Sequence, residues 1–239
     1  MISVTDTKKP LQKMFNRVPK RYDLMNRLLT LRFDELWRRR AAEECLKNSP
    51  EKIIDIGTGT GDLAIHIAGM ANSNTSILGY DFSNPMLETA KAKAEKHSHG
   101  NISFISGDIG NMPFPNDHFD VITTAFAFRN ITFKNPNTDR YLSEILRTLK
   151  KDGKFVIVET CQPESYILRK LFHLYLKYIV SGLGGAISGH RSAYHYLAYS
   201  ATNYYNKDEI NNILKKAGFI KVEYKLLLAG IAAIYTCKK

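Results

Sequence analysis

The chain has 239 residues, of which 44% are hydrophobic and 11% aromatic, and this composition excludes a disordered or fibrous protein. Its length suits one domain with a small attached subdomain at most. The formal charge of +11 indicates an anionic partner, either a membrane surface or a nucleic acid, unless it reflects only a lysine-rich proteome.

The cysteines and the N-terminal sequence bear on the compartment. Cys45, Cys161 and Cys237 are odd in number and far apart, which argues against a disulfide framework and against the spacing of a metal site. Residues 1–10 lack the apolar core of a signal peptide, and no apolar run approaches the ~20 residues that span a bilayer. We therefore expect a cytoplasmic protein without a metal.

Residues 10–47 show helical periodicity, which Pro19 interrupts. This segment precedes the first strand, so residues 1–48 are predicted to form a helical lid over a pocket in the core, residues 49–239. Aromatic and polar side chains cluster within the lid, as a substrate contact would require. The candidate substrate residues of the lid are Tyr22, Asp23 and Asn26.

Two further features of the lid support local predictions. Thr30 or Asp34 is expected to cap the second helix, because both side chains can accept a backbone N–H bond at a helix start. The basic run at residues 38–40 is interpreted as a solvated helix face, since most charged side chains on helices lie in water.

The segment at residues 53–62 organises the core. A β-branched run leads into Gly57, Gly59 and Gly61 and then into a run of Ala and Ile, which predicts strand, tight turn and helix. Such a turn lets a ligand approach the main chain and the free amides of the helix. A dinucleotide fingerprint would need Gly or Ala where Asp62 stands, so the turn favours a ligand with an amino-acid end and no phosphate.

Three acidic residues follow three successive predicted strands. Asp55 could hold an ammonium group, Asp81 the ribose hydroxyls, and Asp108 an adenine amino group. In a parallel sheet these strand ends meet at one edge, so the three carboxylates are expected to converge. The pattern indicates S-adenosylmethionine as the cofactor and resembles class I methyltransferases. The alternative is a plain glycine-rich loop.

Strands and helices alternate along the core, which predicts a parallel, doubly wound sheet. Residues 219–227 and 230–236 look like a closing antiparallel hairpin. The predicted fold is α/β and Rossmann-like, with a mostly parallel sheet of seven strands and an antiparallel closing strand. The other elements are expected as strands at residues 53–56, 76–81, 101–105, 119–124 and 154–159 and as helices at residues 62–70, 85–96, 137–150 and 208–217.

The end of the fourth predicted strand is where an acceptor would meet the methyl group of the cofactor. Arg129 and Asn130 directly follow an apolar run there and are the candidate catalytic residues, which would hold an oxygen of the acceptor. The alternative for Arg129 is a salt-bridged arginine at a strand end. Arginine accepts protons poorly, so a water molecule or another side chain would take the proton of the acceptor.

The predicted helix at residues 165–180 has only a narrow polar stripe, whereas surface helices normally have a wide one. It therefore lies in the core, lines an apolar cavity, or rests on a membrane with its basic side chains near lipid phosphates. It belongs to a substrate-side helical insertion at residues 163–206. Two more candidate substrate residues lie in this insertion, Tyr194 and Tyr196.

Motifs outside the glycine turn carry a resemblance to one family. The sequences YDLMN at residues 22–26, FRNIT at residues 128–132 and RTLKKDG at residues 147–153 resemble signatures of the UbiE-type C-methyltransferases of ubiquinone and menaquinone biosynthesis. The resemblance covers nearly the whole chain and implies the class I methyltransferase fold. The predicted cofactor site consists of Asp55, Gly57, Thr58, Gly59, Thr60, Gly61, Asp81, Phe82, Asp108, Ile109 and Ala125.

The chain departs from the family pattern at several positions. Asp34 stands where the family usually has His, Thr30 where it has Ser, and Ala125 where a serine often lies near the cofactor. Asp34 and Thr30 belong to the lid, and Ala125 ends the fourth strand. These departures bear more on the choice of substrate than on the cofactor.

By this resemblance, the expected activity is methylation of a ring carbon of a reduced prenylated quinone, most simply demethylmenaquinol to menaquinol or else the ubiquinone-pathway benzoquinol. The prenyl tail implies peripheral contact with anionic lipid at the inner face of the membrane. The alternatives are a methyltransferase for RNA or another small molecule and a cofactor-binding assembly protein of a quinone-synthesis complex. No RNA-binding module is visible, so nucleic acid is not an expected partner, and a homodimer is one option.

Overall fold

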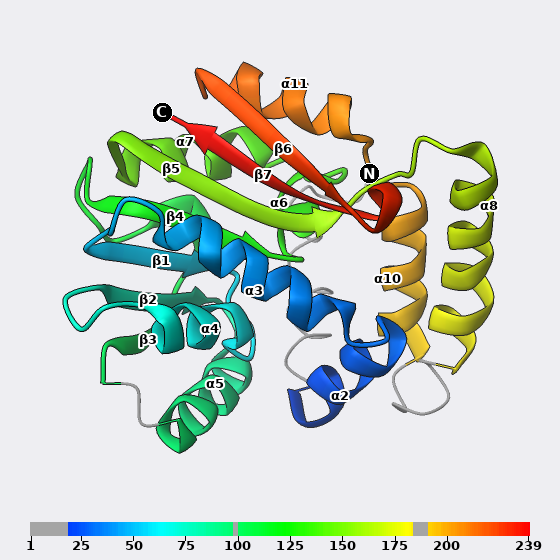
Figure 1. Cartoon of the computed structure of the whole chain (residues 1–239), viewed down its shortest axis with the longest axis horizontal. Coiled ribbons are helices and arrows are strands. Elements are labelled where there is room, and N and C mark those ends of the chain that lie inside the picture. The colour runs from blue at the N-terminus through cyan, green and yellow to red at the C-terminus, as the bar shows by residue number, and fades with distance from the viewer. Residues whose placement is uncertain (1–18, 98–99, 184–190) are drawn as a thin grey trace, which may run out of the picture.

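The computed structural model describes residues 19–97, 100–183 and 191–239. At its centre lies a seven-stranded sheet in the order β3-β2-β1-β4-β5-β7-β6 (Figure 1). Neighbours from β3 to β5 pair in parallel, and β7 runs antiparallel to both β5 and β6. This confirms the predicted sheet. The strands are β1 (Lys52–Ile56), β2 (Ser76–Asp81), β3 (Ile102–Ser106), β4 (Phe119–Ala125), β5 (Leu149–Thr160), β6 (Lys221–Leu227) and β7 (Ala232–Lys238).

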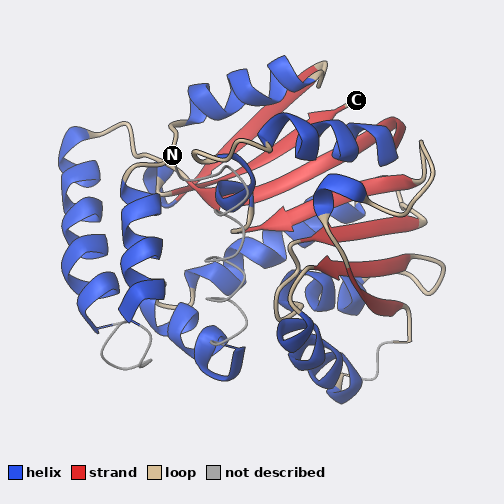
Figure 2. Cartoon of the chain, turned by 180° about the vertical axis from the view of Figure 1, so that it is seen from behind, coloured by secondary structure: helices blue, strands red, loops and turns tan. Residues whose placement is uncertain are grey.

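Helices follow most of the strands, as the alternating pattern predicted, and cover both faces of the sheet (Figure 2). Most boundaries agree within two residues, and the largest difference is at β5, which begins at Leu149 because this residue already pairs with Phe119 of β4. The helices are α2 (Pro19–Leu29), α3 (Phe33–Leu46), α4 (Asp62–Met70), α5 (Asn84–Lys96), α6 (Phe128–Thr132), α7 (Thr138–Thr148), α8 (Tyr166–Leu174), α10 (Arg191–Thr202) and α11 (Lys207–Ala217), with 3₁₀ turns η2 (Ile109–Asn111) and η4 (Leu228–Gly230) and a π-helix η3 (Tyr175–Leu183).

Alternate residues of the central strands supply two separate cores. In β1, Ile54 and Ile56 pack with α6, α7 and α11, whereas Ile53 packs on the other face with α3 and α4. In β5, Phe155 belongs to the first core and Val156 to the second. A strand that is buried on both faces needs apolar residues at successive positions, which explains the β-branched runs seen in the sequence.

The insertion forms a third, smaller core beside the sheet. Phe172, Leu176 and Val180 of α8 and η3 pack against α10 and against Leu29 of α2, and Figure 1 shows α8 and α10 side by side at one end of the molecule. The predicted single helix at residues 165–180 is thus α8 continued by the π-helix η3. The sequence also predicts a mobile loop after this helix from its glycines at 182, 184, 185 and 189; Gly182 lies in η3, and residues 184–190 fall outside the described ranges.

The N-terminal segment differs from the prediction in its cap. The helix expected before Pro19 lies outside the described residues, and α2 begins at Pro19. The N-cap of α3 is Arg32, in the left-handed conformation with a φ of 64° and no side-chain cap, so the predicted cap by Thr30 or Asp34 is wrong. The side chain of Thr30 instead bonds to Asp34 and to the carbonyl of Asn26. That residues 1–48 act as a lid stays a prediction.

Within residues 19–97, 100–183 and 191–239, no helix combines the length and the apolar character that crossing a bilayer requires.

Candidate functional site

The glycine turn after β1 has the geometry that its sequence predicted. Gly57, Gly59 and Gly61 all have positive φ, at 64°, 57° and 81°. A Cβ atom on Gly57 would lie 2.7 Å from the Cβ of Ala127, which follows β4. Residues with side chains are strained at such angles and would close the space, so the turn depends on glycine.

The carboxylate of Asp81 is fixed at the end of β2 and faces this turn. Its Oδ2 accepts a hydrogen bond from the N–H of Gly59 (2.9 Å), and its Oδ1 accepts one from Ser83 (2.8 Å). Burial raises the pKa of Asp81, although backbone N–H groups oppose the shift. A carboxylate has about four acceptor positions, so the group is still able to accept a hydrogen bond from a ligand hydroxyl.

Asp55, at the end of β1, is buried with one oxygen unsatisfied. Thr58 Oγ1 donates to its Oδ2 (2.6 Å), while its Oδ1 has no hydrogen-bond partner within the described residues. Burial raises the pKa of Asp55 to about 7, against the opposing effects of the Thr58 bond and the Arg38 charge. Because buried polar atoms are normally bonded, this oxygen is suited to receive a donor from a ligand.

The turn and these carboxylates surround a cavity of about 290 Å³, which we call the strand-end cavity because it lies beyond the carboxyl ends of β1, β2 and β4. Every predicted cofactor residue except Gly61 lines it. Asp108 lies on its far side at the start of η2, where it accepts a bond from the N–H of Gly110 (3.0 Å). A glycine cradle, an unsatisfied carboxylate oxygen and a second strand-end carboxylate fit an amino-acid end and a ribose.

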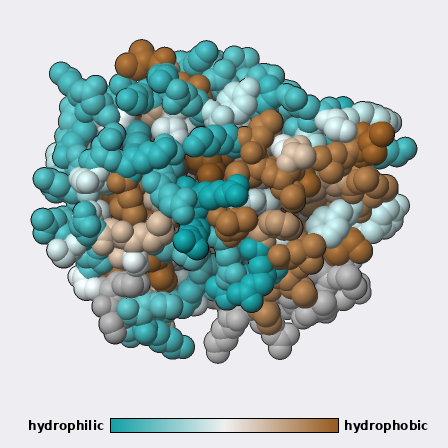
Figure 3. All heavy atoms as spheres, viewed as in Figure 1, coloured by the Kyte–Doolittle hydropathy of each residue, from teal (hydrophilic) through white to brown (hydrophobic). Residues whose placement is uncertain are grey.

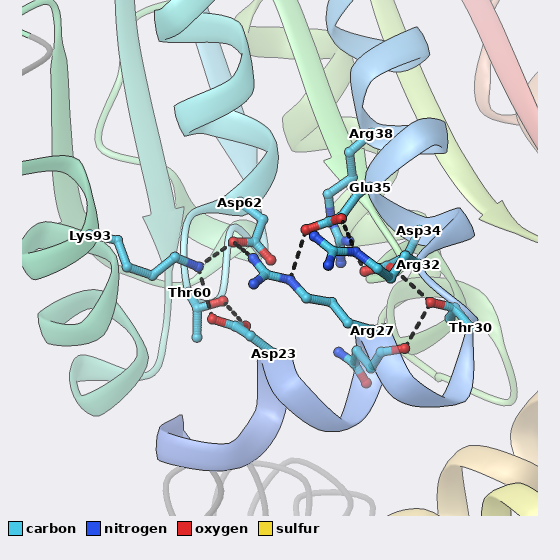
Figure 4. Close-up of polar contacts among 11 residues, drawn as sticks. Asp23, Arg27, Thr30, Arg32, Asp34, Glu35, Arg38, Thr60, Asp62 and Lys93 are labelled. Carbon is cyan, nitrogen blue, oxygen red and sulfur yellow. Dashed lines mark hydrogen bonds and ion pairs between the residues drawn. The ribbon is translucent and has the colours of Figure 1, made fainter. Parts of the chain in front are cut away.

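Asp23, a predicted substrate residue, is held by contacts within the protein, and its contact with substrate stays a prediction. Thr60 Oγ1 donates to its Oδ1 (2.5 Å) and Lys93 Nζ to its Oδ2 (2.8 Å). Lys93 also bonds to Asp62, and Arg27 extends the network to Glu35 (3.0 Å) (Figure 4). Asp23 therefore ties α2 to the glycine turn.

A second, apolar cavity of about 390 Å³ adjoins the first. Its walls come from α2, α3, α8, η3 and α10, and most of its lining side chains are aliphatic or aromatic, so we call it the apolar cavity. The predicted substrate residues Asn26, Tyr194 and Tyr196 line it, whereas Asp23 does not. The side chain of Tyr22 lies outside the described part of the chain.

Three residues line both cavities: Arg38, Phe126 and Asn130. Phe126 directly follows β4 with a φ of 58°, an unusual angle for an aromatic residue, and its N–H donates to the carbonyl of Val158 (2.8 Å). The guanidinium of Arg38 lies over the Phe126 ring, 5.0 Å from its centroid. A ligand in one cavity would meet a ligand in the other at this wall.

Sequence reasoning missed Arg38. The run at residues 38–40 was expected to be solvated, and this is true of Arg39 and Arg40, which are exposed. Arg38 is buried instead and donates from Nη1 to Asp34 Oδ2. The available signal was the spacing, since Asp34 lies one helical turn before Arg38 and Trp37 marks the buried face of the same helix.

The candidate catalytic residues occupy different positions. Arg129 lines only the apolar cavity, and its Nη1 bonds to Glu159 Oε1 (3.1 Å) and Thr160 Oγ1 (2.6 Å). The salt-bridge alternative therefore describes its contacts, while its catalytic role stays a prediction. Asn130 reaches both cavities, and Tyr196 donates to its Oδ1 (3.4 Å). Asn130 is thus the candidate placed where two ligands would meet.

The buried carboxyl of Asp55 should make the unliganded protein less stable as the pH rises. Its pKa is about 7 in the folded protein against an ordinary value of 3.8, so between these values the folded state holds a proton that the unfolded state has released. The free energy of unfolding then falls through this window and stays low above it. Asp55→Asn removes this contribution.

Chemical denaturation at a series of pH values from about 5 to 8 measures the effect. The variant should gain stability relative to wild type by several kcal/mol as the pH rises. The control is Glu88→Gln, because the Glu88 side chain is 72% exposed, and it should follow wild type. A difference between Asp55→Asn and wild type that does not change with pH would contradict the prediction.

Comparison with solved structures places the fold. A SAM-dependent methyltransferase from Thermotoga maritima superimposes with a TM-score of 0.64 at 19% identity, covering 95% of this chain and 99% of that one. Another, from Aquifex aeolicus, gives a TM-score of 0.57 at 18% identity, covering 82% and 88%. At such identities the likeness establishes the class I methyltransferase fold.

Several relatives found by sequence are more similar to this chain than these two solved structures are. The demethylmenaquinone methyltransferases of Thermotoga maritima and Thermus thermophilus are 38% and 37% identical to this chain, covering 96% and 93% of it and 96% and 98% of those proteins. The ubiquinone/menaquinone biosynthesis C-methyltransferase UbiE of Geotalea daltonii is 35% identical over the full length of both. Residues 1–239 match the sequence model of one methyltransferase family. The chain therefore belongs to the ubiE/COQ5 methyltransferase family and is a methyltransferase that uses S-adenosylmethionine.

Proposed function

We propose that this protein methylates a ring carbon of a reduced prenylated quinone and that its acceptor is demethylmenaquinol. The observation that carries the proposal is the apolar cavity, which adjoins the strand-end cavity and shares Arg38, Phe126 and Asn130 with it. Such a cavity suits a flat aromatic ring with an apolar tail. The names of two relatives that are 38% and 37% identical to the chain support demethylmenaquinone as the unmethylated quinone.

The strand-end cavity would hold the cofactor by three carboxylates. Asp55 offers its unsatisfied oxygen to the ammonium group, Asp81 accepts from the ribose hydroxyls, and Asp108 lies within reach of the adenine amino group. S-adenosylmethionine supplies a sulfonium methyl group, which is electrophilic. The glycine turn would let the main chain approach the cofactor, whose methyl group would react with an acceptor held at the shared wall.

The shared wall would orient the acceptor. Asn130 presents its side chain to both cavities and is steadied by Tyr196 (3.4 Å) and by Asn135, whose Nδ2 donates to the Asn130 carbonyl (2.8 Å). The apolar walls would shield most of the ring from bulk water, which would strengthen the polar contacts there. Held in this way, the ring carbon meets the methyl group at short range, and proximity supplies much of the rate enhancement.

Methyl transfer from labelled S-adenosylmethionine in detergent tests the proposal. Two acceptors are compared, reduced demethylmenaquinone and the reduced demethyl precursor of ubiquinone, and product is expected from the first. Product from the second alone would contradict the choice of acceptor, and product from both would mean a dual enzyme. Bound cofactor without any product would overturn the proposal and favour an RNA substrate or an assembly role.

Arg129 is tested with its partner, because a single substitution would confuse folding with catalysis. Arg129→Met leaves the buried Glu159 carboxylate without its cation, which should cost about 3–5 kcal/mol. The pair Arg129→Met with Glu159→Gln removes both charges and keeps an oxygen for the N–H of Thr160, but the N–H of residue 129 loses its acceptor Oε2, so part of the stability should return.

The double variant then reports on catalysis. If Arg129 helps to stabilise the acceptor oxygen, turnover should fall relative to Glu159→Gln alone, while the affinity for the cofactor stays the same. Isothermal titration and single-turnover assays give the two quantities. If the double variant turns over as fast as Glu159→Gln alone, the prediction is contradicted and Arg129 has only a structural role in the ion pair.

We also propose that the outer face of the insertion contacts anionic lipid. Ile167, Leu171 and Tyr178 are 71%, 58% and 59% exposed, and the neighbouring Lys170 and Lys177 are exposed as well. Figure 3 shows apolar side chains gathered over this end of the molecule. Apolar side chains with cations beside them suit the boundary between headgroups and acyl chains, where a prenylated acceptor resides.

Flotation with anionic vesicles at low salt should recover wild type and lose the double variant Ile167→Ser with Tyr178→Ser. Neither residue lines the apolar cavity, so turnover on a detergent-dissolved acceptor should not change. The control is Ile220→Ser, which is 80% exposed beside the C-terminal strand. Wild type that remains unbound at low salt would contradict the lipid contact.

A further inference from the structure

The apolar cavity contains a carboxylate to which no role has yet been assigned. Asp34 lies in the first turn of α3 and is 2% exposed. Among the described residues that line this cavity, it is the only one that carries a carboxylate. A buried carboxylate in an otherwise apolar wall is costly to keep, so its contacts and position bear on the reaction.

Asp34 is held from two sides and still has capacity to accept a proton. Thr30 Oγ1 donates to its Oδ1 (2.6 Å), and Arg38 Nη1 donates to its Oδ2 (Figure 4). Each carboxylate oxygen has two acceptor positions, and these contacts use one on each. The two contacts therefore fix the orientation of the carboxylate without using all of its hydrogen-bond acceptor positions.

The other basic groups near the cavity are less well placed. Glu159 does not line it, and its oxygens already accept bonds from Arg129 and Thr160. Asp55 lines only the strand-end cavity. Tyr196 does line the apolar cavity, but burial raises the pKa of its hydroxyl, so it remains protonated near neutral pH.

Arg38 links Asp34 to the place of reaction. Its guanidinium bonds to Asp34 and lies over the ring of Phe126, and Arg38 lines both cavities. A cation at this wall would stabilise negative charge that develops on an acceptor oxygen. The pair thus offers a proton acceptor and a charge stabiliser on neighbouring turns of one helix.

We propose that Asp34 takes the hydroxyl proton of the acceptor, with Arg38 as the residue that orients Asp34 and stabilises the resulting oxyanion. The inference rests on the proposed function, because it requires a ring hydroxyl in the apolar cavity. It supplies the proton acceptor that Arg129 cannot be, since a guanidinium that stays charged does not accept a proton.

The O–H proton moves to Asp34, and the electron pair left on oxygen is delocalised onto the neighbouring ring carbon. That carbon forms a bond to the methyl carbon, whose bond to sulfur breaks with its electron pair remaining on sulfur. The methylated ring carbon then loses its own hydrogen as a proton to water, and the oxygen recovers a proton from Asp34. One proton is released in total.

Asp34→Asn tests the role, because asparagine keeps an oxygen for Thr30 and cannot take up the proton. The turnover number should fall by about 10²–10⁴-fold, the range of general base catalysis, with little change in cofactor affinity. The control on the same helix is Glu43→Gln, whose side chain is 51% exposed, and its turnover should equal that of wild type. Undiminished turnover of Asp34→Asn would overturn the proposal.

A second readout does not depend on how much of the variant folds. A demethylmenaquinol with fluorine on its distal ring has a more acidic hydroxyl, so its methylation depends less on a general base. The ratio of its turnover to that of the parent acceptor, measured on one preparation, is independent of the active fraction. This ratio should rise severalfold in Asp34→Asn, and also in Asp34→Asn with Arg38→Met, relative to wild type.

The outcomes separate this inference from the function on which it rests. If wild type methylates neither demethylmenaquinol nor its fluorinated analogue, the proposed function fails. If wild type is active and the turnover ratio is the same in Asp34→Asn, Asp34 is not the proton acceptor, while the proposed function stands. A lower turnover with an unchanged ratio would likewise assign Asp34 to packing of the cavity and overturn the proposal.

Discussion

The parallel pairing of β1 with β4 decides where chemistry can take place in this protein. Asp55 lies opposite Thr123 in the register, so the glycine turn after β1 and the segment after β4 leave the sheet side by side. They approach so closely that a methyl group on Gly57 would collide with Ala127. Ligands of parallel α/β sheets bind beyond such strand ends. Here the segment after the first strand forms the glycine turn that lines the strand-end cavity, and the segment after the second supplies Phe126 and Asn130, which line both cavities.

Buried charge is concentrated around that wall. Arg129 pairs with Glu159 and Arg38 with Asp34, while Asp55 keeps an unsatisfied oxygen toward the strand-end cavity. Buried ion pairs contribute little net stability, because the loss of hydration offsets the attraction between the charges. Their effect here is orientation: each pair holds at least one charged group at a cavity wall in a defined position. Removing one partner would therefore lower the stability and leave the remaining charged group without the contact that positions it.

The apolar cavity depends on segments that are far apart in the chain. Leu29 ends α2, Phe172 and Leu176 belong to the insertion, and Ile231 precedes β7, yet all four line it. The hydroxyl of Tyr175 donates to the carbonyl of Leu29 and joins the insertion to the N-terminal segment. Because the insertion packs inward through one side of α8 and η3, its other side is left apolar and exposed, next to the cavity that would receive a prenylated ring.

The sequence by itself determined the features that depend on local conformation and periodicity. Glycines 57, 59 and 61 require left-handed angles, alternating apolar runs specify strands buried on both faces, and acids after β-branched runs mark strand ends; each of these depends on a few neighbouring residues. Only the tertiary structure decided the partners of the charged side chains. Asp23 meets Thr60, 37 residues away, and Arg129 meets Glu159, 30 residues away. Arg38 was expected in solvent, as most charged side chains on helices are. It is buried because α3 packs against the segment after β4, where Arg38 lies over Phe126. Partners of this kind are set by the packing of distant segments, which no local pattern contains.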